Sequence, residues 1–312
     1  MTSAPHPILA RPFVLGGSGL VGSSYVRAMH ERGLPVRGTY RTRPAEGLEP
    51  FDFANDPAPL LDAARATLVI LASALTNVDY CESHAEETWR RNVLELEPTV
   101  RWCREHDVPL VWFGTDYVFD GIAGPYAEDA PTHPLNVYGR SKLEGEARVA
   151  TVPRHAILRV TNVFDIGLDR DRKNYLVRCV EYFRDRKPLV VPNDQLATPI
   201  LAPWLAEFTL RLIEREALLA AGAPSVLNVA CDELVSRVEF AARVAQRLGA
   251  DASLVEGRRT SVLNQAAPRP LRAGFRNDRL KSLLGLTRIS FDEALDQVTP
   301  RMREVFGAGT TS

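Results

Sequence analysis

The 312-residue chain lacks the sequence features of a secreted or membrane-spanning protein. It has only four cysteines, with no C-x-x-C pair and no short-range pairing, so we predict reduced thiols packed as small apolar residues. No continuous apolar stretch reaches the roughly 18 residues that a membrane span needs, and no apolar signal segment follows Met1. We therefore expect a cytoplasmic protein with no membrane partner.

The chain also lacks an excess of charge of either sign. Lys and Arg number 38 against 39 for Asp and Glu, which leaves a net charge of −1 and no basic field for a phosphate backbone. We therefore expect no nucleic-acid partner. The six histidines show no metal-ligand spacing, so we predict no metal site. An apolar content of 45% and a charged content of 25% are ordinary for a globular domain, so an apolar core is available.

Apolar runs alternate with amphipathic helical segments through the first half of the chain. Several of these runs are continuously apolar, which is typical of strands buried on both faces in a parallel sheet. Repeated β-α-β units predict an α/β protein with a doubly wound parallel sheet of the Rossmann-like kind. The expected strands are 13–15, 36–40, 68–72, 110–113 and 156–160, and the expected helices are 20–32, 85–105 and 138–150.

The pattern changes after Phe164. Segment 165–173 is charged and is predicted to be a solvated loop. The remaining expected elements are helices 174–186, 201–221, 236–248 and 290–306, strand 189–191 and an extended piece near 252–256. We predict a cofactor-binding domain over 1–164, with 200–230 returning to it, and a smaller, interleaved substrate-binding lobe over 165–199 and 231–312.

A run of glycines stands between the first predicted strand and the first predicted helix. Gly16, Gly19 and Gly22 are spaced three apart, and glycine at such a turn lets the backbone approach a pyrophosphate at the helix N-terminus. We therefore predict that this turn, with Leu20 and Val21 at the start of the helix, binds a dinucleotide. The spacing differs from the G-x-G-x-x-G of the common fingerprint.

The end of the second predicted strand is the place that reads the adenosine ribose. It carries Arg41 and Arg43 and no carboxylate, so nothing repels a 2′-phosphate and two guanidiniums can bind one. NADPH is therefore the predicted cofactor, with NADH as the alternative. Asp52 and Phe53, further on, are placed to hydrogen-bond and flank the adenine.

A tyrosine and a lysine stand four residues apart on the helix predicted over 138–150. Tyr138 and Lys142 therefore share one helix face, where an ammonium can lower the pKa of the phenol and let it act as an acid. Thr115 follows a buried strand and so lies at the carboxyl edge of the sheet, where ligands bind. Its hydroxyl is predicted to hydrogen-bond a substrate carbonyl.

With these pieces in order, the chain resembles the extended short-chain dehydrogenase/reductases. More narrowly it is similar to dTDP-4-dehydrorhamnose reductases and related 4-ketoreductases of deoxysugar pathways. The resemblance spans roughly residues 13–286. It is carried by the runs 16–22 (GGSGLVG), 76–79 (TNVD), 114–119 (GTDYVF), 134–145 (PLNVYGRSKLEG), 158–161 (LRVT), 193–195 (NDQ), 198–199 (TP) and 269–270 (RP).

The resemblance implies a catalytic triad of Thr115, Tyr138 and Lys142 that reduces the C4 carbonyl of a nucleotide-linked 4-keto-6-deoxy sugar. It also implies that Asn92 has a scaffold or proton-relay role. Ala72, Ser73 and Ala74 are expected beneath the cofactor. The expected substrate-binding residues are Thr76, Val78, Asp116, Tyr117, Asn162, Gln195 and Arg269.

Two positions depart from the family pattern near the sugar. Asn162 stands where rhamnose-pathway reductases usually have tryptophan, and Asn77 replaces a small residue. The nucleotide, the sugar and the product configuration at C4 therefore stay open. The basic stretches 258–259 and 269–272 are interpreted either as a clamp for a substrate diphosphate or as a solvated surface. A magnesium-bridged dimer, known in some family members, has no counterpart in this sequence, and a homodimer is an open alternative.

Two other functions fit the same motifs. An epimerase of the same fold uses the same triad without net redox chemistry, whereas a 4,6-dehydratase usually has Asp-Glu where this chain has Asp116 and Tyr117. A non-catalytic NADP-binding subunit, resembling the regulatory subunit of methionine adenosyltransferase, is a third alternative. The intact set of Thr115, Tyr138 and Lys142 favours catalysis.

Overall fold

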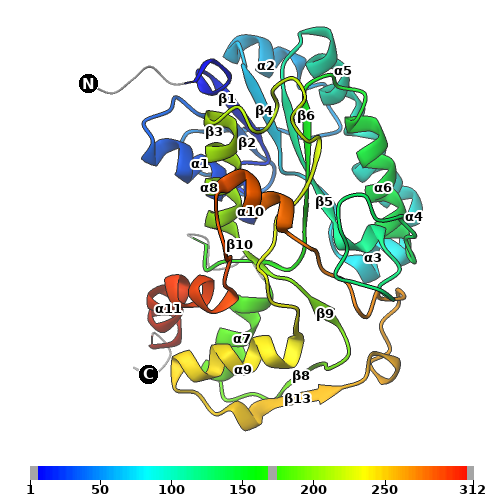
Figure 1. Cartoon of the computed structure of the whole chain (residues 1–312), viewed down its shortest axis with the longest axis vertical. Coiled ribbons are helices and arrows are strands. Elements are labelled where there is room, and N and C mark those ends of the chain that lie inside the picture. The colour runs from blue at the N-terminus through cyan, green and yellow to red at the C-terminus, as the bar shows by residue number, and fades with distance from the viewer. Residues whose placement is uncertain (1–5, 168–173, 308–312) are drawn as a thin grey trace.

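The computed structural model describes residues 6–167 and 174–307, and its centre is a parallel sheet of seven strands (Figure 1). The strand order is β11-β6-β5-β4-β1-β2-β3, so the direction of winding reverses between β1 and β4. The predicted α/β class with a doubly wound parallel sheet is confirmed. The strands are β1 (Pro12–Leu15), β2 (Arg37–Tyr40), β3 (Leu48–Pro50), β4 (Leu68–Leu71), β5 (Leu110–Thr115), β6 (His155–Val160) and β11 (Val226–Asn228).

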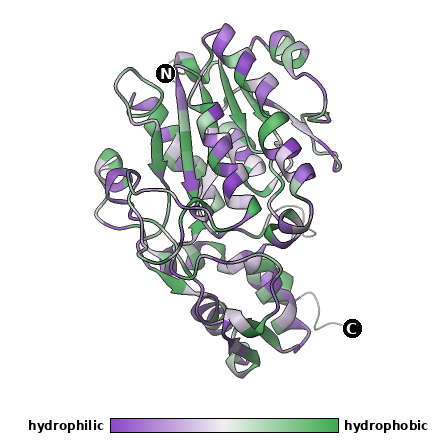
Figure 2. Ribbon diagram, turned by 90° about the vertical axis from the view of Figure 1, so that its right-hand side faces the viewer, coloured by the Kyte–Doolittle hydropathy of each residue, from purple (hydrophilic) through white to green (hydrophobic). Residues whose placement is uncertain are grey.

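Helices cover both faces of this sheet, which explains why its central strands are continuously apolar. Helices α1 (Leu20–Glu31) and α8 (Ala202–Glu214) pack on the face that carries Val14 and Ile70. On the other face, the side chains of Leu15 and Val69 meet three helices. These are α2 (Ala58–Ala64), α5 (Glu97–Glu105) and α6 (Val137–Val149). Figure 2 shows the apolar strands between layers of helices with mixed polarity.

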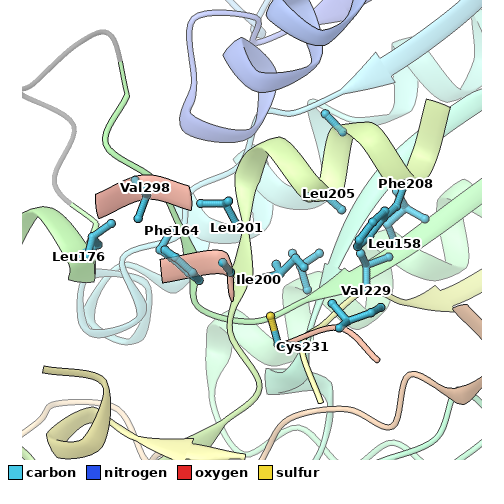
Figure 3. Packing of buried hydrophobic residues seen from close by; sticks show 14 of the residues in the cluster. Leu158, Phe164, Leu176, Ile200, Leu201, Leu205, Phe208, Val229, Cys231 and Val298 are labelled. Carbon is cyan, nitrogen blue, oxygen red and sulfur yellow. The ribbon is translucent and has the colours of Figure 1, made fainter. Parts of the chain in front are cut away.

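A smaller lobe lies beyond the carboxyl ends of the strands, at the bottom of Figure 1. Its hydrophobic residues belong to the same cluster as one face of the sheet. Figure 3 shows Phe164 and Val298 beside Leu201, the residue before α8, with Leu205 of α8 further along the same cluster. One continuous core therefore joins the two parts. The lobe contains α7 (Tyr175–Arg184), α9 (Arg237–Leu248), α11 (Phe291–Gly307) and the parallel pair β8 (Leu189–Pro192) and β13 (Val255–Arg258).

Short elements connect the sheet to this lobe. Strand β7 (Val163–Phe164) pairs with β10 (Ile200–Leu201), and β9 (Leu196–Ala197) pairs with β12 (Val235–Ser236). Helix α10 (Asp278–Leu284) packs against α8 and β11. None of the helices in the described part of the chain is long and apolar enough to cross a membrane. Residues 168–173 of the predicted charged loop lie outside the described residues.

The prediction of one long helix over residues 85–105 was wrong. The segment divides into α4 (Ala85–Trp89), a π-helical turn over Arg90–Leu94 and α5 (Glu97–Glu105). Asn92 lies in the π-helical turn, and its amide accepts a hydrogen bond from Leu75 N and donates one to Leu75 O. Proline in the first turn of α5 suits a helix start because that position needs no amide hydrogen. A local widening of the helix therefore turns the Asn92 side chain onto a neighbouring loop.

The helix predicted over residues 201–221 ends early, at Glu214. Glu216 and Leu219 have φ angles of 55° and 66°, a left-handed backbone that an α-helix does not allow. The apolar residues beyond the helix, among them Leu218, nevertheless pack in the main core, which explains why their pattern read as helical.

Candidate active site

A cavity of about 580 Å³ opens at the carboxyl ends of β1, β4 and β5. It lies beside the reversal of strand order, the place where open α/β sheets bind ligands. Most of the residues predicted from sequence line it. From the cofactor and catalytic sets these are Gly19, Leu20, Val21, Ala72, Ser73, Ala74, Thr115, Tyr138 and Lys142, and from the substrate set Thr76, Val78, Asp116, Tyr117 and Asn162.

The glycine turn is packed too tightly for side chains. Gly16 has a φ of +83°, and a Cβ there would lie 3.0 Å from the carbonyl oxygen of Ala72. A Cβ on Gly22 would lie 2.2 Å from the carbonyl oxygen of Gly16. Gly19 caps α1 with no side-chain hydrogen bond to the first amides, so these N–H groups face the cavity as an anion site. The turn therefore fits the pyrophosphate of a dinucleotide.

Thr115 is the last residue of β5 and begins a short 3₁₀ turn. Its hydroxyl donates to Asp116 Oδ1 at 3.3 Å and accepts from the amide of Tyr117 at 3.3 Å. The other carboxylate oxygen of Asp116 accepts from Thr161 Oγ1 at 2.7 Å. Burial raises the pKa of Asp116 to about 6, against the lowering effect of these hydrogen bonds. A buried carboxyl group therefore holds the Thr115 hydroxyl in place.

Tyr138 lies in the first turn of α6. The helix begins at Asn136, whose side chain accepts from Gly139 N at 2.8 Å, and Gly139 lets the helix approach the Tyr117 carbonyl, where a Cβ would lie at 2.2 Å. The ring of Tyr138 meets the ring of Tyr117 edge-on, with 5.5 Å between centroids. Burial raises the pKa of Tyr138, while hydrogen bonding with the Thr115 side chain acts to lower it.

Lys142 lies one turn further along α6, and only 3% of the residue is exposed. Its Nζ stands 3.7 Å from the centroid of the Trp112 ring. Burial lowers the pKa of Lys142 to about 7, against the raising effect of Glu146. The expected lowering of the Tyr138 pKa by Lys142 is therefore not seen in this structure, in which burial dominates the pKa of both groups.

A second chamber of about 660 Å³ adjoins the first and extends into the smaller lobe. The two share six lining residues: Val78, Tyr117, Asn162, Val163, Asn174 and Arg237. Gln195 and Arg269, both predicted to bind substrate, line the second chamber but not the first. Asn162 is held with a φ of 45°, a conformation that asparagine tolerates better than most residues.

Three arginines line the second chamber: Arg178, Arg237 and Arg269. Arg269 pairs with Asp79 at 2.6 Å, its side chain is 7% exposed, and its Nε is buried with no hydrogen-bond partner among the described residues. Arg237 lines both chambers and lies 4.5 Å above the Tyr175 ring. With Glu181 as the carboxylate among its lining residues, the chamber carries a net positive charge next to the catalytic cavity.

Arg178 and Arg237 were missed by sequence reasoning. The only signal for Arg237 is its place in the first turn of α9, where the positive end of the helix dipole disfavours a cation without an anionic partner. Arg178 gave no signal. The other arginines of the suspected clamp lie elsewhere: Arg258 pairs with Glu256, and Arg272 donates to Gly124 O. Of the clamp interpretation, only Arg269 lines a chamber.

The predicted adenosine-binding residues do not gather in one place. Arg43 lines a hollow of about 700 Å³ with Gly17 and Ser18 at the glycine turn, whereas Arg41 is exposed and lines none of the cavities described. Asp52 is turned to the amide of Ala54. Phe53 is buried and lines a small space with Ser73, Ala74 and Lys142, so it supports the loop beneath the first cavity.

Asn92 stands behind the catalytic helix and not in the cavity. Besides its two bonds to Leu75, its amide donates to Ser141 Oγ at 3.0 Å, and Ser141 donates in turn to the Tyr138 carbonyl. Of the two roles considered for Asn92, this geometry fits a scaffold. Among the residues that the structure describes, no group of His, Cys, Asp and Glu is arranged to hold a metal ion.

Known proteins share this architecture. A protein-family model described as the RmlD substrate binding domain matches residues 11–304. The chain belongs to the RmlD family. This membership confirms the predicted resemblance to dTDP-4-dehydrorhamnose reductases and the prediction of an NAD(P)-dependent oxidoreductase.

Three similar proteins span nearly all or most of this RmlD-family chain. The probable low-salt glycan biosynthesis reductase Agl14 of Haloferax volcanii is 32% identical over 91% of this chain and 95% of its own length. A dTDP-4-dehydrorhamnose reductase of Mycobacterium tuberculosis is 31% identical over 75% of this chain and 76% of its own. The structure of dTDP-4-dehydrorhamnose reductase from Bacillus anthracis in complex with NADP has a TM-score of 0.82 at 20% identity, and the match covers 94% and 99% of the two chains.

Proposed function

We propose that this protein uses NADPH to reduce the 4-keto group of a nucleotide-linked 4-keto-6-deoxy sugar. The observation that carries the proposal is the joint lining of one cavity by Thr115, Tyr138 and Lys142 together with the glycine turn. Within the RmlD family, relatives with this chain length and fold carry the name dTDP-4-dehydrorhamnose reductase. The proposal therefore rests on the site and agrees with the family.

The nicotinamide cofactor supplies the hydride that reaches the sugar C4. The turn Gly16–Gly22 holds the pyrophosphate, Leu20 and Val21 begin the helix whose amides face it, and Ala72–Ala74 lie beneath the nicotinamide half. Arg43 with Ser18 binds the 2′-phosphate, which favours NADPH over NADH. Arg41 adds charge nearby but lines none of the cavities described.

Tyr138 gives its phenolic proton to the oxygen that becomes the alkoxide. Burial keeps this proton in place at neutral pH, so the phenol is in its acid form when the carbonyl arrives. Without substrate the Thr115 hydroxyl donates its single proton to Asp116. When the carbonyl arrives, this proton turns to the carbonyl oxygen and holds it within reach of the phenol. Lys142 binds the ribose hydroxyls on the nicotinamide side.

The second chamber takes the nucleoside diphosphate of the substrate. Arg237 stands where the two chambers meet, so it binds the phosphate next to the sugar, while Arg178 and Arg269 bind further out. The buried Nε of Arg269 gains an acceptor in this way. Gln195 binds at the nucleotide end, and Thr76, Val78, Tyr117 and Asn162 surround the sugar.

This assignment divides the chain into two functional parts. Residues 1–164, with 200–230 returning to the sheet, bind the cofactor and carry the triad. Residues 165–199 and 231–312 supply Arg178, Arg237 and Arg269 and so form the substrate-binding part.

A panel of dTDP-, UDP-, GDP- and CDP-linked 4-keto-6-deoxy sugars tests the proposal. We expect NADPH absorbance to fall with at least one of them, and NADPH to be used in preference to NADH. Isomerisation of a nucleotide sugar without NADPH oxidation would identify an epimerase instead. A folded protein that binds NADPH, turns over no nucleotide sugar and alters a partner enzyme would identify a regulatory subunit.

A further inference from the structure

The ammonium of Lys142 lies against an aromatic ring at the wall of the cavity, with no hydrogen-bond acceptor of the described residues beside it. Among the residues that the structure describes, its Nζ makes no hydrogen bond or ion pair. The Nζ lies over the Trp112 ring, 3.7 Å from the ring centroid. Both residues are only 3% exposed. A cation with little access to water needs compensation. The face of the Trp112 indole, which carries partial negative charge, is the group in contact with the ammonium, and Glu146 adds a favourable charge from one turn along α6.

The carboxylates that face Lys142 are engaged elsewhere. Glu146, one turn along α6, accepts from Arg159 Nε at 2.9 Å and Nη2 at 2.7 Å. Glu95 pairs with Arg90, and Arg91, which lines the same small space as Lys142, pairs with Glu87.

The other titratable side chains that line the cavity, among them the cation of Arg237, make no hydrogen bond or ion pair with the amine. Asp116 is bonded to Thr115 and Thr161, and Tyr138 holds its proton because burial raises the pKa of its phenol. Burial also lowers the pKa of Lys142 to about 7, so the charge of this amine is easily lost near neutral pH. Small changes in its surroundings therefore change its protonation.

The structure holds the Trp112 ring firmly in this place. Trp112 belongs to β5, whose residues alternate between the two faces of the sheet, and its side chain points toward α6. Gly145 on α6 makes room for the indole, because a Cβ there would lie 2.8 Å from Trp112 Cζ2. Gly145 follows Lys142 by three residues and so shares its helix face. The indole is thus clamped between the strand and the catalytic helix.

We propose that Trp112 is a positioning residue for Lys142, whose ring face holds the ammonium beside the cofactor site and favours its protonated form. The inference rests on the proposed function only in assigning Lys142 to cofactor binding. It gives a role to the large aromatic residue that lines the cavity on the catalytic strand, three residues before Thr115. It also predicts that the protonation of Lys142 at a given pH depends on which residue occupies position 112.

The test is the pH dependence of NADPH affinity, measured by nucleotide fluorescence between pH 5 and 9 and taken relative to that of Lys142→Met, which cancels the titration of the NADPH 2′-phosphate at about pH 6. The charged amine binds NADPH better than the neutral amine, so this relative affinity is constant at low pH and falls up to tenfold per pH unit above the pKa of Lys142 in the free enzyme. Trp112→Leu should move the onset of this fall down by about one pH unit, the size expected for loss of a desolvated cation–π contact. Trp112→Phe, which keeps a smaller ring, should move it by less than half as much.

Two control variants separate this role from packing. Trp102→Leu removes a buried tryptophan from the same face of the sheet that has no contact with Lys142, and should leave the onset unchanged. Lys142→Met, taken by itself, should lack this fall and show only the titration of the 2′-phosphate. An unchanged onset in Trp112→Leu, or equal shifts in the Leu and Phe variants, would overturn the inference.

If Trp112→Leu does not fold, labelling all four tryptophans with trifluorotryptophan provides a second route, because fluorine weakens the negative ring face with little change of shape. Labelled wild type should show the downward shift, and labelled Trp112→Phe should match its unlabelled form. A wild type insensitive to the label would overturn the inference. NADPH binding without turnover of any sugar would refute the proposed reductase and leave this test intact.

Discussion

Buried ionisable side chains distinguish this site from an ordinary sheet edge. Asp116, Tyr138 and Lys142 line one cavity and are each largely buried. Burial raises the pKa of Asp116 and Tyr138 and lowers the pKa of Lys142, which favours the neutral form of each side chain. Such a set is costly to the fold and is typical of catalytic sites. The sequence could predict Tyr138 and Lys142 from their spacing on one helix face. It could not predict Trp112 or Arg237, whose importance depends on contacts between distant segments.

Asp116 should reduce the stability of the folded protein at neutral pH. Its folded-state pKa of about 6 lies above the usual value, so the native carboxyl keeps a proton that the unfolded chain has already lost. The stability supplied by this group is therefore full below about pH 4, falls as the pH rises to about 6 and is absent above it. We predict that Asp116→Asn raises the free energy of unfolding at pH 7 by on the order of 2 kcal/mol and has little effect at pH 4. Urea denaturation at the two pH values measures this, and an equal effect at both would contradict the assignment.

Arg43 should determine the choice between NADPH and NADH. Replacing it with alanine removes a charge-assisted contact to the 2′-phosphate, so we predict about a tenfold or greater rise in the Kd for NADPH and no change for NADH. Fluorescence titration with each cofactor provides the measurement. Arg104→Ala, which alters an exposed arginine on α5, is the matched control. Equal losses of affinity for both cofactors would refute the role of Arg43.

At the scale of elements, the sequence predicted what depends on local pattern. The predicted ends of the continuously apolar strands β1, β4 and β5 and of the helices α1, α6 and α9 lie within two residues of the observed ends. Short edge elements such as β3, β11 and α10 were missed because they have too few residues to show a period. The break within residues 85–105 was missed because it depends on Asn92 meeting a loop that is distant in sequence.

The π-helical turn should be a stability element as well as a support for α6. Asn92→Ala removes three hydrogen bonds from a buried amide, two to Leu75 and one to Ser141, and leaves their partners unsatisfied. We predict a loss of about 2–4 kcal/mol in the free energy of unfolding. Asn55→Ala, at an exposed turn, should change it by less than about 0.5 kcal/mol. Denaturant unfolding measures the free energy of unfolding of both variants. A similarly small loss of this free energy in both would show that the Asn92 hydrogen bonds are not needed for stability.

At the scale of the whole molecule, the site is built by both parts of the chain. The parallel sheet supplies the triad and the glycine turn, and the smaller lobe supplies the arginines of the second chamber. One continuous hydrophobic core joins them, so the two chambers are held in register. Sequence reasoning predicted both parts and their interleaving. Of the basic stretches considered as a clamp, only Arg269 lines the second chamber. Arg178 and Arg237 were not predicted because they come from α7 and α9, which only the fold brings together.

Arg237 should link the two chambers in function. We predict that Arg237→Ala raises the KM for the nucleotide sugar about 10- to 100-fold, with a small change in kcat and no change in the Kd for NADPH. Arg258→Ala, at an exposed arginine that lines neither chamber, is the control and should leave KM unchanged. Steady-state kinetics with the best substrate of the panel measures both variants. An unchanged KM in Arg237→Ala would show that Arg237 does not bind the substrate diphosphate.

The central claim is that Tyr138 protonates the oxygen of a sugar ketone as hydride reaches its C4. The most direct measurement is of deuterium transfer: the enzyme is incubated with 4-deuterated NADPH and the 4-keto sugar, and the position of deuterium in the product is determined by mass spectrometry and NMR. The account predicts one deuterium at sugar C4 with the wild type. With Tyr138→Phe it predicts that deuterium transfer is about 10²- to 10⁴-fold slower, while NADPH binds nearly as tightly as to the wild type. Deuterium absent from C4, or transfer by Tyr138→Phe at the wild-type rate, would contradict it.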